Sequence, residues 1–240
     1  MADGQPTRNR SSSQLALDLD LPPHFGREDF LAAPCNEAAL AMIEAWPQWP
    51  DTLLFLLGPA GAGKTHLAAI WAERAGAAVI EAQDLASADL PSLATRSALV
   101  IDNADRIGAA EAALFHLLNM AREHGITLVF TARQRPELWG LKTADLLSRL
   151  RLAPALELGA PDEALLKAVL VKLFCDRQII VDATVIDTLA LHIDRSLDLA
   201  RRLVALLDRE ALASGRKVTR AMVRDLLDRF DFGEDEDARP

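Results

Sequence analysis

The chain has 240 residues, 50% of them apolar and 25% charged, a composition typical of soluble globular proteins and sufficient for one large or two small domains. Its 35 acidic against 26 basic residues argue against an extended basic surface for nucleic acid. Cys35 and Cys175 are too far apart in the sequence to suggest a disulfide framework or a cysteine zinc site. Without a long apolar run or a secretory signal, we expect a soluble protein of a reducing compartment.

Strands alternate with helices in the first two thirds of the chain. Short apolar runs closed by turn residues predict buried strands, and apolar residues at three-to-four spacing predict helices. In chain order the predicted elements are a strand at Thr52–Leu57, a helix at about His66–Arg74, a strand at Ala98–Ile101, a helix at Ala109–His124 and a strand at Ile126–Phe130. This alternation predicts an α/β fold with a parallel sheet and flanking helices.

Only helices are predicted after Pro161. They span Asp162–Asp176, Ala183–Ile193, Ser196–Ala213 and Thr219–Phe230, with Asp182, Ser196 and Thr219 as expected N-caps. We therefore divide the chain near Gly159. The expected parts are a disordered tail at 1–24, an αβ domain at 25–159, a small helical lid domain at 160–232 and an acidic tail at 233–240.

A phosphate-binding loop follows the first predicted strand and opens the next helix. The segment Gly58-Pro59-Ala60-Gly61-Ala62-Gly63-Lys64-Thr65 fits G-x-x-x-x-G-K-[ST] in the strand–helix context that this motif needs. Its glycines let backbone N–H groups surround phosphate oxygens at a helix N-terminus. We expect Lys64 to reach the β- and γ-phosphates of a nucleotide and the Thr65 hydroxyl to bind Mg²⁺.

Two later strands end in polar residues suited to the same site. Asp102 ends the run Ala98–Ile101 and is the expected second Mg²⁺ ligand. The next residue is Asn103, whose amide cannot take a proton from an attacking water, so we expect slow hydrolysis. Thr131, after Ile126–Phe130, either contacts a γ-phosphate as a sensor or only closes its strand.

With these motifs, the segment Asp145-Leu146-Leu147-Ser148-Arg149-Leu150 resembles the AAA+ ATPases, within them the DnaA-related proteins of the Hda type, regulatory inactivators of DnaA. The segments Asp29–Leu31, Asn36–Leu40 and Leu114–Asn119 also resemble that family, and the likeness covers roughly residues 25–230. DnaA continues into a basic helix-turn-helix domain, whereas this sequence ends in acidic residues. We therefore expect no sequence-specific DNA binding.

The resemblance assigns roles that spacing alone does not. It implies that Arg149 is an arginine finger that enters a neighbour's nucleotide site, with Arg135 and Arg151 as further candidates at that interface. From the residues alone, a surface arginine at a helix end is the favoured interpretation of Arg149. The resemblance also places Leu31 at the adenine pocket.

A peptide in the N-terminal tail resembles the clamp-binding motif of Hda-type proteins. In Gln14-Leu15-Ala16-Leu17-Asp18-Leu19, the residues Leu15, Leu17 and Leu19 share one face of an extended chain, and Gln14 can make the specific hydrogen bond. Asp18 stands where apolar residues or proline are usual, so we expect modest affinity for the sliding clamp.

One position departs from the family pattern. AAA+ proteins place a lid arginine on the nucleotide, and the matching position here is Asp198. Arg195 and Arg201, three residues to either side, are both open as substitutes. This departure, together with Asn103, favours slow intrinsic turnover and a stable ADP-bound form.

The resulting hypothesis is a bacterial cytoplasmic, replisome-associated regulator that binds ADP or ATP with Mg²⁺ and restrains DNA replication. It would bind the sliding clamp and stimulate hydrolysis of the ATP bound to DnaA. The alternatives are a self-sufficient AAA+ ATPase that works as a ring, such as a helicase loader or remodeller, and a P-loop small-molecule kinase. The lack of substrate lids between the predicted strands counts against the kinase.

Overall fold

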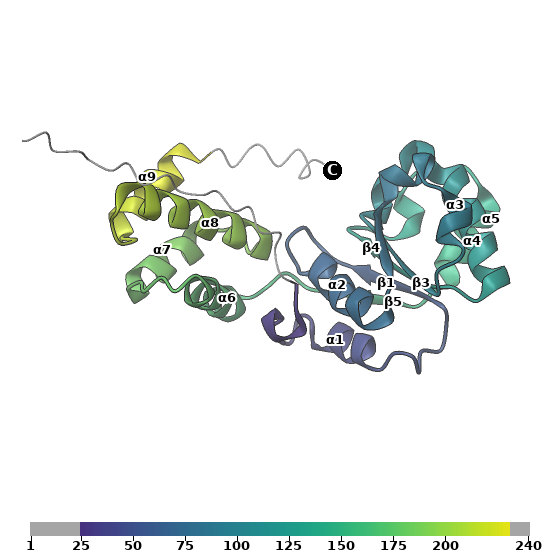
Figure 1. Cartoon of the computed structure of the whole chain (residues 1–240), viewed down its shortest axis with the longest axis horizontal. Coiled ribbons are helices and arrows are strands. Elements are labelled where there is room, and N and C mark those ends of the chain that lie inside the picture. The colour runs from purple at the N-terminus through teal and green to yellow at the C-terminus, as the bar shows by residue number, and fades with distance from the viewer. Residues whose placement is uncertain (1–24, 231–240) are drawn as a thin grey trace, which may run out of the picture.

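The computed structural model describes residues 25–230, which form an αβ domain followed by a group of four helices (Figure 1). The expected tail 1–24, with its peptide at 14–19, and the acidic tail 233–240 lie outside the described residues. Within the described part, none of the helices combines the length and the apolar character needed to span a bilayer.

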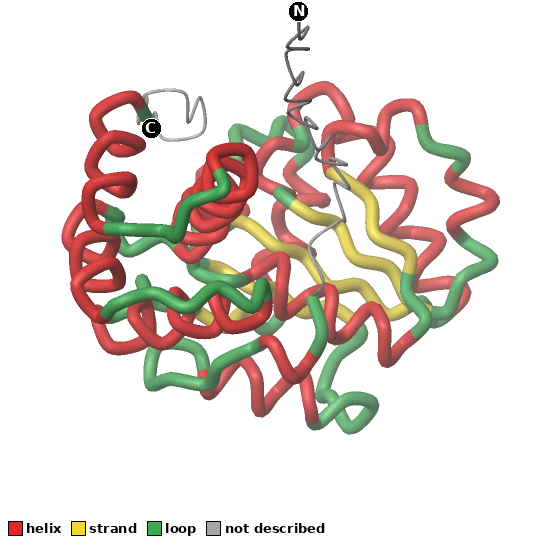
Figure 2. Tube along the Cα trace, turned by 60° about the vertical axis from the view of Figure 1, so that its left-hand side comes forward, coloured by secondary structure: helices red, strands yellow, loops and turns green. Residues whose placement is uncertain are grey.

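The αβ domain is built on one parallel sheet, whose twist is visible in Figure 2. Its strands are β1 (Leu53–Leu57), β2 (Ala78–Glu81), β3 (Ala98–Asp102), β4 (Thr127–Ala132) and β5 (Ala155–Glu157). Their spatial order is β2-β3-β4-β1-β5, so β1 lies between β4 and β5. Strands β1, β3 and β4 are almost wholly buried because helices cover both faces of the sheet.

Helices pack on both faces of this sheet. They are α1 (Glu37–Glu44) and α2 (Lys64–Ala75) on one face, and α3 (Leu90–Leu93), α4 (Glu111–His124) and α5 (Ala144–Leu152) on the other. Alternate residues of β1 point to opposite faces of the sheet. Leu54 and Leu56 pack with α2 on one face, whereas Phe55 and Leu57 pack with α4 and α5 on the other. The connections include 3₁₀ turns η1 (Arg27–Asp29), η2 (Ala82–Ser87), η3 (Ala104–Arg106), η4 (Gly108–Ala110) and η5 (Pro136–Leu138).

The lid helices have an apolar core of their own. They are α6 (Glu163–Asp176), α7 (Ala183–His192), α8 (Leu197–Ser214) and α9 (Arg220–Arg229), and their buried side chains form a cluster separate from the two sheet layers. Asp162, Ser196 and Thr219 cap α6, α8 and α9 by accepting backbone N–H groups. Asp182 occupies the N-cap position of α7, but its side chain makes no capping hydrogen bond.

The fold class expected from the sequence is confirmed, and the long predicted elements agree closely with the structure. Three bounds need correction: α2 begins at Lys64, two residues earlier than expected, α4 begins at Glu111, two residues later than expected, and β4 extends to Ala132. The elements that the sequence did not predict, β2, β5, α1, α3 and α5, are all short. Short elements carry too few apolar repeats for a periodicity to be recognised.

Candidate functional site

Three strand ends meet at the carboxyl edge of the sheet. The loop 58–65 follows β1, Asp102 ends β3, and Thr131 lies near the end of β4. Because β4 pairs with both β1 and β3, these segments from distant parts of the sequence lie side by side. Ligand sites of open parallel sheets form at this edge.

The loop 58–65 depends on glycine at two positions. Gly58 has φ +153°, and a Cβ there would lie 2.3 Å from the backbone oxygen of Leu158. Gly61 has φ +70°, and a Cβ there would lie 2.9 Å from the Cα of Ser196 in the lid. Neither backbone can give way, so a side chain at either position would force the loop open. Of the loop residues, Ala60, Gly61, Gly63, Lys64 and Thr65 line a pocket, whereas Gly58, Pro59 and Ala62 do not.

Lys64 points its ammonium into the mouth of the loop. Nζ donates hydrogen bonds to the backbone oxygens of Gly58 and Pro59, both at 2.8 Å. Burial lowers the pKa of Lys64 to about 8, with the charges of Asp105 and Asp102 opposing this effect and that of Arg133 adding to it. An ammonium has three N–H donors, so a phosphate oxygen can take the third.

Oxygen ligands for a divalent cation gather beside Lys64. The Thr65 hydroxyl donates to both carboxylate oxygens of Asp102 at 3.1 Å. Thr131, which is fully buried, donates a short hydrogen bond from its hydroxyl to Asp102 and accepts the Asn103 N–H at 2.9 Å. A hydroxyl and an adjacent carboxylate are the donor set that Mg²⁺ takes beside phosphates, so Thr65 and Asp102 fit this ion. Thr131 orients Asp102 and does not itself line the pocket.

Asn103 presents an amide at the next position of the pocket wall. Its φ of +53° is left-handed, a conformation that asparagine tolerates better than most residues. Nδ2 donates to Oε2 of Glu81 at 3.0 Å, because Glu81 on β2 lies opposite Asp102 in the sheet. Sequence reasoning missed Glu81, since β2 was not predicted. A side-chain amide held in this way cannot act as a general base.

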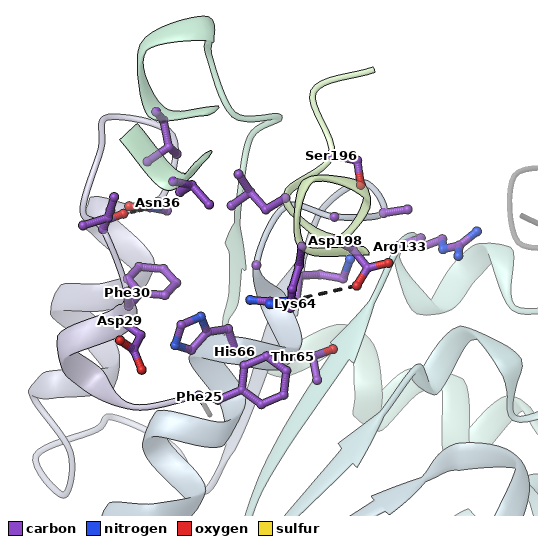
Figure 3. Close-up of a pocket in the computed structure, with 18 of the residues that line it drawn as sticks. Phe25, Asp29, Phe30, Asn36, Lys64, Thr65, His66, Arg133, Ser196 and Asp198 are labelled. Carbon is purple, nitrogen blue, oxygen red and sulfur yellow. Dashed lines mark hydrogen bonds and ion pairs between the residues drawn. The ribbon is translucent and has the colours of Figure 1, made fainter. Parts of the chain in front are cut away.

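The opposite wall of the pocket, which encloses about 290 Å³, is largely apolar and aromatic. The His66 ring lies 5.1 Å from that of Phe25 and 5.2 Å from that of Phe30 (Figure 3). Burial lowers the pKa of His66, so the neutral ring donates from Nε2 to the Gly26 oxygen at 3.0 Å. Leu31 lines the same wall.

A buried asparagine shapes the segment that carries Leu31. The Asn36 side chain accepts the Ala33 N–H at 2.8 Å and donates to the Leu31 oxygen at 3.1 Å. These two bonds fix the loop between η1 and α1. Sequence reasoning had noted this segment only as part of a resemblance.

The lid closes the pocket from the third side. The Leu197 N–H donates to the Gly61 oxygen at 3.0 Å, which joins the first turn of α8 to the phosphate loop. Lys172 of α6 pairs with Asp29 of η1 at 2.7 Å, which joins the lid to the aromatic wall. Asp198 and Arg201 both line the pocket, and Arg195, in the loop before α8, does not.

Arg133 is a pocket residue that sequence reasoning missed. It follows β4, two residues beyond Thr131, and its backbone N–H donates to Oδ1 of Asp105 at 3.2 Å. Its side chain lines the pocket together with Lys64 and Asn103. The only available sequence signal was its distance from Thr131, which predicts a position near the carboxyl edge but not the direction of the side chain.

The arginine expected to act as a finger is not in the pocket. Figure 1 shows α5, which carries Arg149, at the end of the αβ domain opposite the lid. The Arg149 guanidinium donates to Oδ1 of Asn119 at 2.6 Å, pairs with Asp145 at 2.6 Å and lies 5.3 Å above the Phe115 ring. Its side chain remains 32% exposed.

The two other expected interface arginines are paired on the surface nearby. Arg135 pairs with Glu157 at 2.7 Å, and Arg151 pairs with Glu137 at 2.9 Å. Both side chains are more than half exposed, at 59% and 56%. Neither lines the pocket.

The order of the sheet, the phosphate loop and the helical lid together define the architecture of the AAA+ proteins. Domain III of the replication initiation protein DnaA from Thermotoga maritima superposes with a TM-score of 0.73 and 21% identity, over 88% of this chain and 98% of that domain. AMPPCP-bound DnaA from Aquifex aeolicus gives a TM-score of 0.66 and 17% identity, over 82% of this chain and 68% of that protein.

A third similar structure is a motor protein. The RuvB Holliday junction branch migration motor of Thermotoga maritima gives a TM-score of 0.64 and 20% identity, over 85% of this chain and 72% of that protein. No protein-family model and no curated protein matches the sequence. The superpositions establish a shared fold. At identities this low they do not establish a shared activity, which must be argued from the site.

Proposed function

We propose that this chain is a nucleotide-binding regulator of replication initiation of the Hda type, which stimulates the hydrolysis of ATP bound to DnaA. It binds ADP or ATP with Mg²⁺ in its own pocket. It inserts Arg149 into the nucleotide site of DnaA and is held at the replication machinery by the sliding clamp. The separation of Arg149 from the chain's own pocket is the observation that carries this proposal.

The chemistry of the pocket supports nucleotide binding. Backbone N–H groups, the Lys64 ammonium and the N-terminus of α2 converge at one end, as a chain of phosphates requires. The aromatic wall of Phe25, Phe30 and His66 at the other end suits a planar base. When bound, Mg²⁺ would neutralise charge on the terminal phosphates, held by Thr65 and Asp102.

Slow intrinsic turnover follows from the groups around the expected water position. Asn103 cannot accept a proton, and its side chain is held by Glu81. The lid presents the carboxylate of Asp198 to the pocket. Asp198, in the first turn of α8, interacts favourably with the helix dipole and so stabilises the helix. The same carboxylate repels phosphate and therefore disfavours hydrolysis.

Action on another molecule is supported by the way Arg149 is held. Asn119, Asp145 and Phe115 restrain the guanidinium on the surface, where a neighbouring molecule can reach it. A pre-oriented cation loses little conformational entropy when it meets the charge that develops during phosphoryl transfer. The structures of DnaA with a similar fold make a DnaA–ATP complex a natural partner for this face.

A self-sufficient ATPase is the second candidate, favoured by the likeness to the RuvB motor. In that case Arg149 would complete the site of a second copy of this chain. Steady-state ATP hydrolysis by the isolated protein, measured over a range of protein concentrations, separates the two. Turnover that rises with assembly would support the ring ATPase and contradict the regulator.

The deciding experiment is single-turnover hydrolysis of ATP preloaded on DnaA, with and without this protein and clamp-loaded DNA. We expect acceleration that requires the clamp and that weakens when Gln14 is replaced by Ala. Residues 14–19 lie outside the described part of the chain, so clamp binding rests on the sequence motif alone. Failure to accelerate, with the protein folded and saturated with ADP, would overturn the regulatory proposal while leaving nucleotide binding intact.

A further inference from the structure

The pocket contains two arginines, which lie at its opposite ends. Arg201 of α8 has its guanidinium carbon 5.0 Å above the Phe25 ring, and its charge acts on His66 at the aromatic wall. Arg133 follows β4 and acts instead on Lys64 at the phosphate end. Figure 3 shows Arg133 on the far side of Asp198 from Phe25, His66 and Asp29.

The order of the phosphates along this pocket is set by the loop 58–65. A base at the aromatic wall directs the phosphates towards Lys64, and the last phosphate lies where Lys64, Thr65 and Asp102 meet. Arg201, stacked on Phe25, is therefore at the base and sugar end. Arg133 is the arginine whose charge acts on Lys64, at the phosphate end of the pocket.

Among the described residues, the lid side chains that line the pocket include one cation, Arg201, which stacks on Phe25. The lid also presents the carboxylate of Asp198, whose Oδ1 lies 4.0 Å from Nη1 of Arg201. A triphosphate brings more negative charge to this end than a diphosphate does. Lys64 already donates to two backbone oxygens and keeps one N–H for a phosphate, so a second side-chain cation at this end would favour the triphosphate.

We propose that Arg133 contacts the terminal phosphate of the nucleotide bound to its own chain and thereby makes the pocket discriminate ATP from ADP. The second cation at the phosphate end is supplied from the sheet. A guanidinium suits this task because its planar N–H donors match two phosphate oxygens at once. Its backbone is fixed by the bond from its N–H to Asp105, so the side chain starts from a defined position.

This inference rests on nucleotide binding by the chain but not on any action upon DnaA. The test measures dissociation constants for ADP and for AMPPCP, which is not hydrolysed, by calorimetry with Mg²⁺. Arg133→Ala should weaken AMPPCP about tenfold to a hundredfold, the range for a lost charge-assisted hydrogen bond, and change ADP affinity less than about threefold. Arg133→Lys should retain part of the preference as a point charge.

Arg135→Ala is the matched control. It removes the same charge two residues further along, where Arg135 pairs with Glu157 outside the pocket. We expect it to leave both affinities unchanged. Retained ADP binding by Arg133→Ala also shows that this variant is folded.

Equal losses for ADP and AMPPCP in Arg133→Ala, or no loss for either, would overturn the role of Arg133. Wild-type protein that binds neither nucleotide would instead overturn the proposed nucleotide site, and the inference with it. If Arg135→Ala lost the preference for AMPPCP over ADP to the same extent as Arg133→Ala, the effect would be a general one of surface charge. That result would also contradict the proposal.

Discussion

The pocket presents the cation of Lys64, and the surface around α5, here called the α5 face (Arg149 with Asn119, Asp145 and Phe115), presents that of Arg149. The two cations are held in different ways. Lys64 is buried and held by two backbone carbonyls, so its position follows from the fold of the loop. Arg149 is partly exposed and held by the side chains of Asn119, Asp145 and Phe115. The pocket is suited to keeping a ligand of its own, and the α5 face is suited to a group brought by another molecule.

Of the changes proposed here, removal of Arg149 from the α5 face should have the largest effect on activity. Arg149→Ala should reduce the stimulated hydrolysis of DnaA-bound ATP by about a thousandfold, the usual effect of an arginine finger, while ADP affinity stays unchanged. Single-turnover hydrolysis and calorimetry measure the two properties separately. Arg229→Ala, which removes a charge paired with Glu210 on the lid, is the control, and an equal loss there would contradict the assignment to Arg149.

Removing Lys64 from the pocket should weaken nucleotide binding, the property that Arg149→Ala leaves unchanged. Lys64→Ala should weaken ADP binding by about a hundredfold or more, because a phosphate loses its charge-assisted partner. We expect no loss of thermal stability, since the variant removes a buried charge that is costly to desolvate. Calorimetry and thermal melting measure these effects. Lys167→Ala, on the lid surface, removes the same charge and should change nothing.

Nucleotide binding in the pocket should also depend on pH. The pKa of Lys64 is lowered to about 8, and phosphate binding needs the protonated ammonium. ADP affinity, measured without Mg²⁺, should be constant between about pH 7 and pH 8, where the terminal phosphate is ionised, and fall by up to about tenfold per pH unit above pH 8. An affinity that stays constant to pH 9.5 would show that burial does not depress this pKa.

The smallest expected effect concerns the orientation of Arg149. Asn119→Ala removes the hydrogen bond to its guanidinium and should slow stimulated hydrolysis by about three- to tenfold, at saturating protein, without weakening the complex. Asn119→Asp keeps an acceptor oxygen in place and should restore the rate. A change in the concentration dependence alone would mean that Asn119 contributes to docking and not to positioning.

The loop 58–65, Asp102 and the fold class were predictable because their signals are local. A glycine-rich strand–helix turn and an apolar strand that ends in a carboxylate can each be read from a few neighbouring residues. The long helices were predictable for the same reason. Their apolar spacing repeats often enough to be recognised, and glycines such as Gly76 and Gly125 end them in the left-handed conformation.

The rest of the site depends on contacts between residues that are far apart in the sequence. Glu81 meets Asn103 only because β2 pairs with β3 in one register, and Phe25 meets His66 only when the first segment crosses α2. Likewise, the direction of a side chain after a strand decides that Arg133 lines the pocket and Arg135 does not. The sequence by itself determined the chemistry of the loop and the pattern of strands and helices. The tertiary structure decided which charges meet there, because register and side-chain direction arise from packing between distant segments.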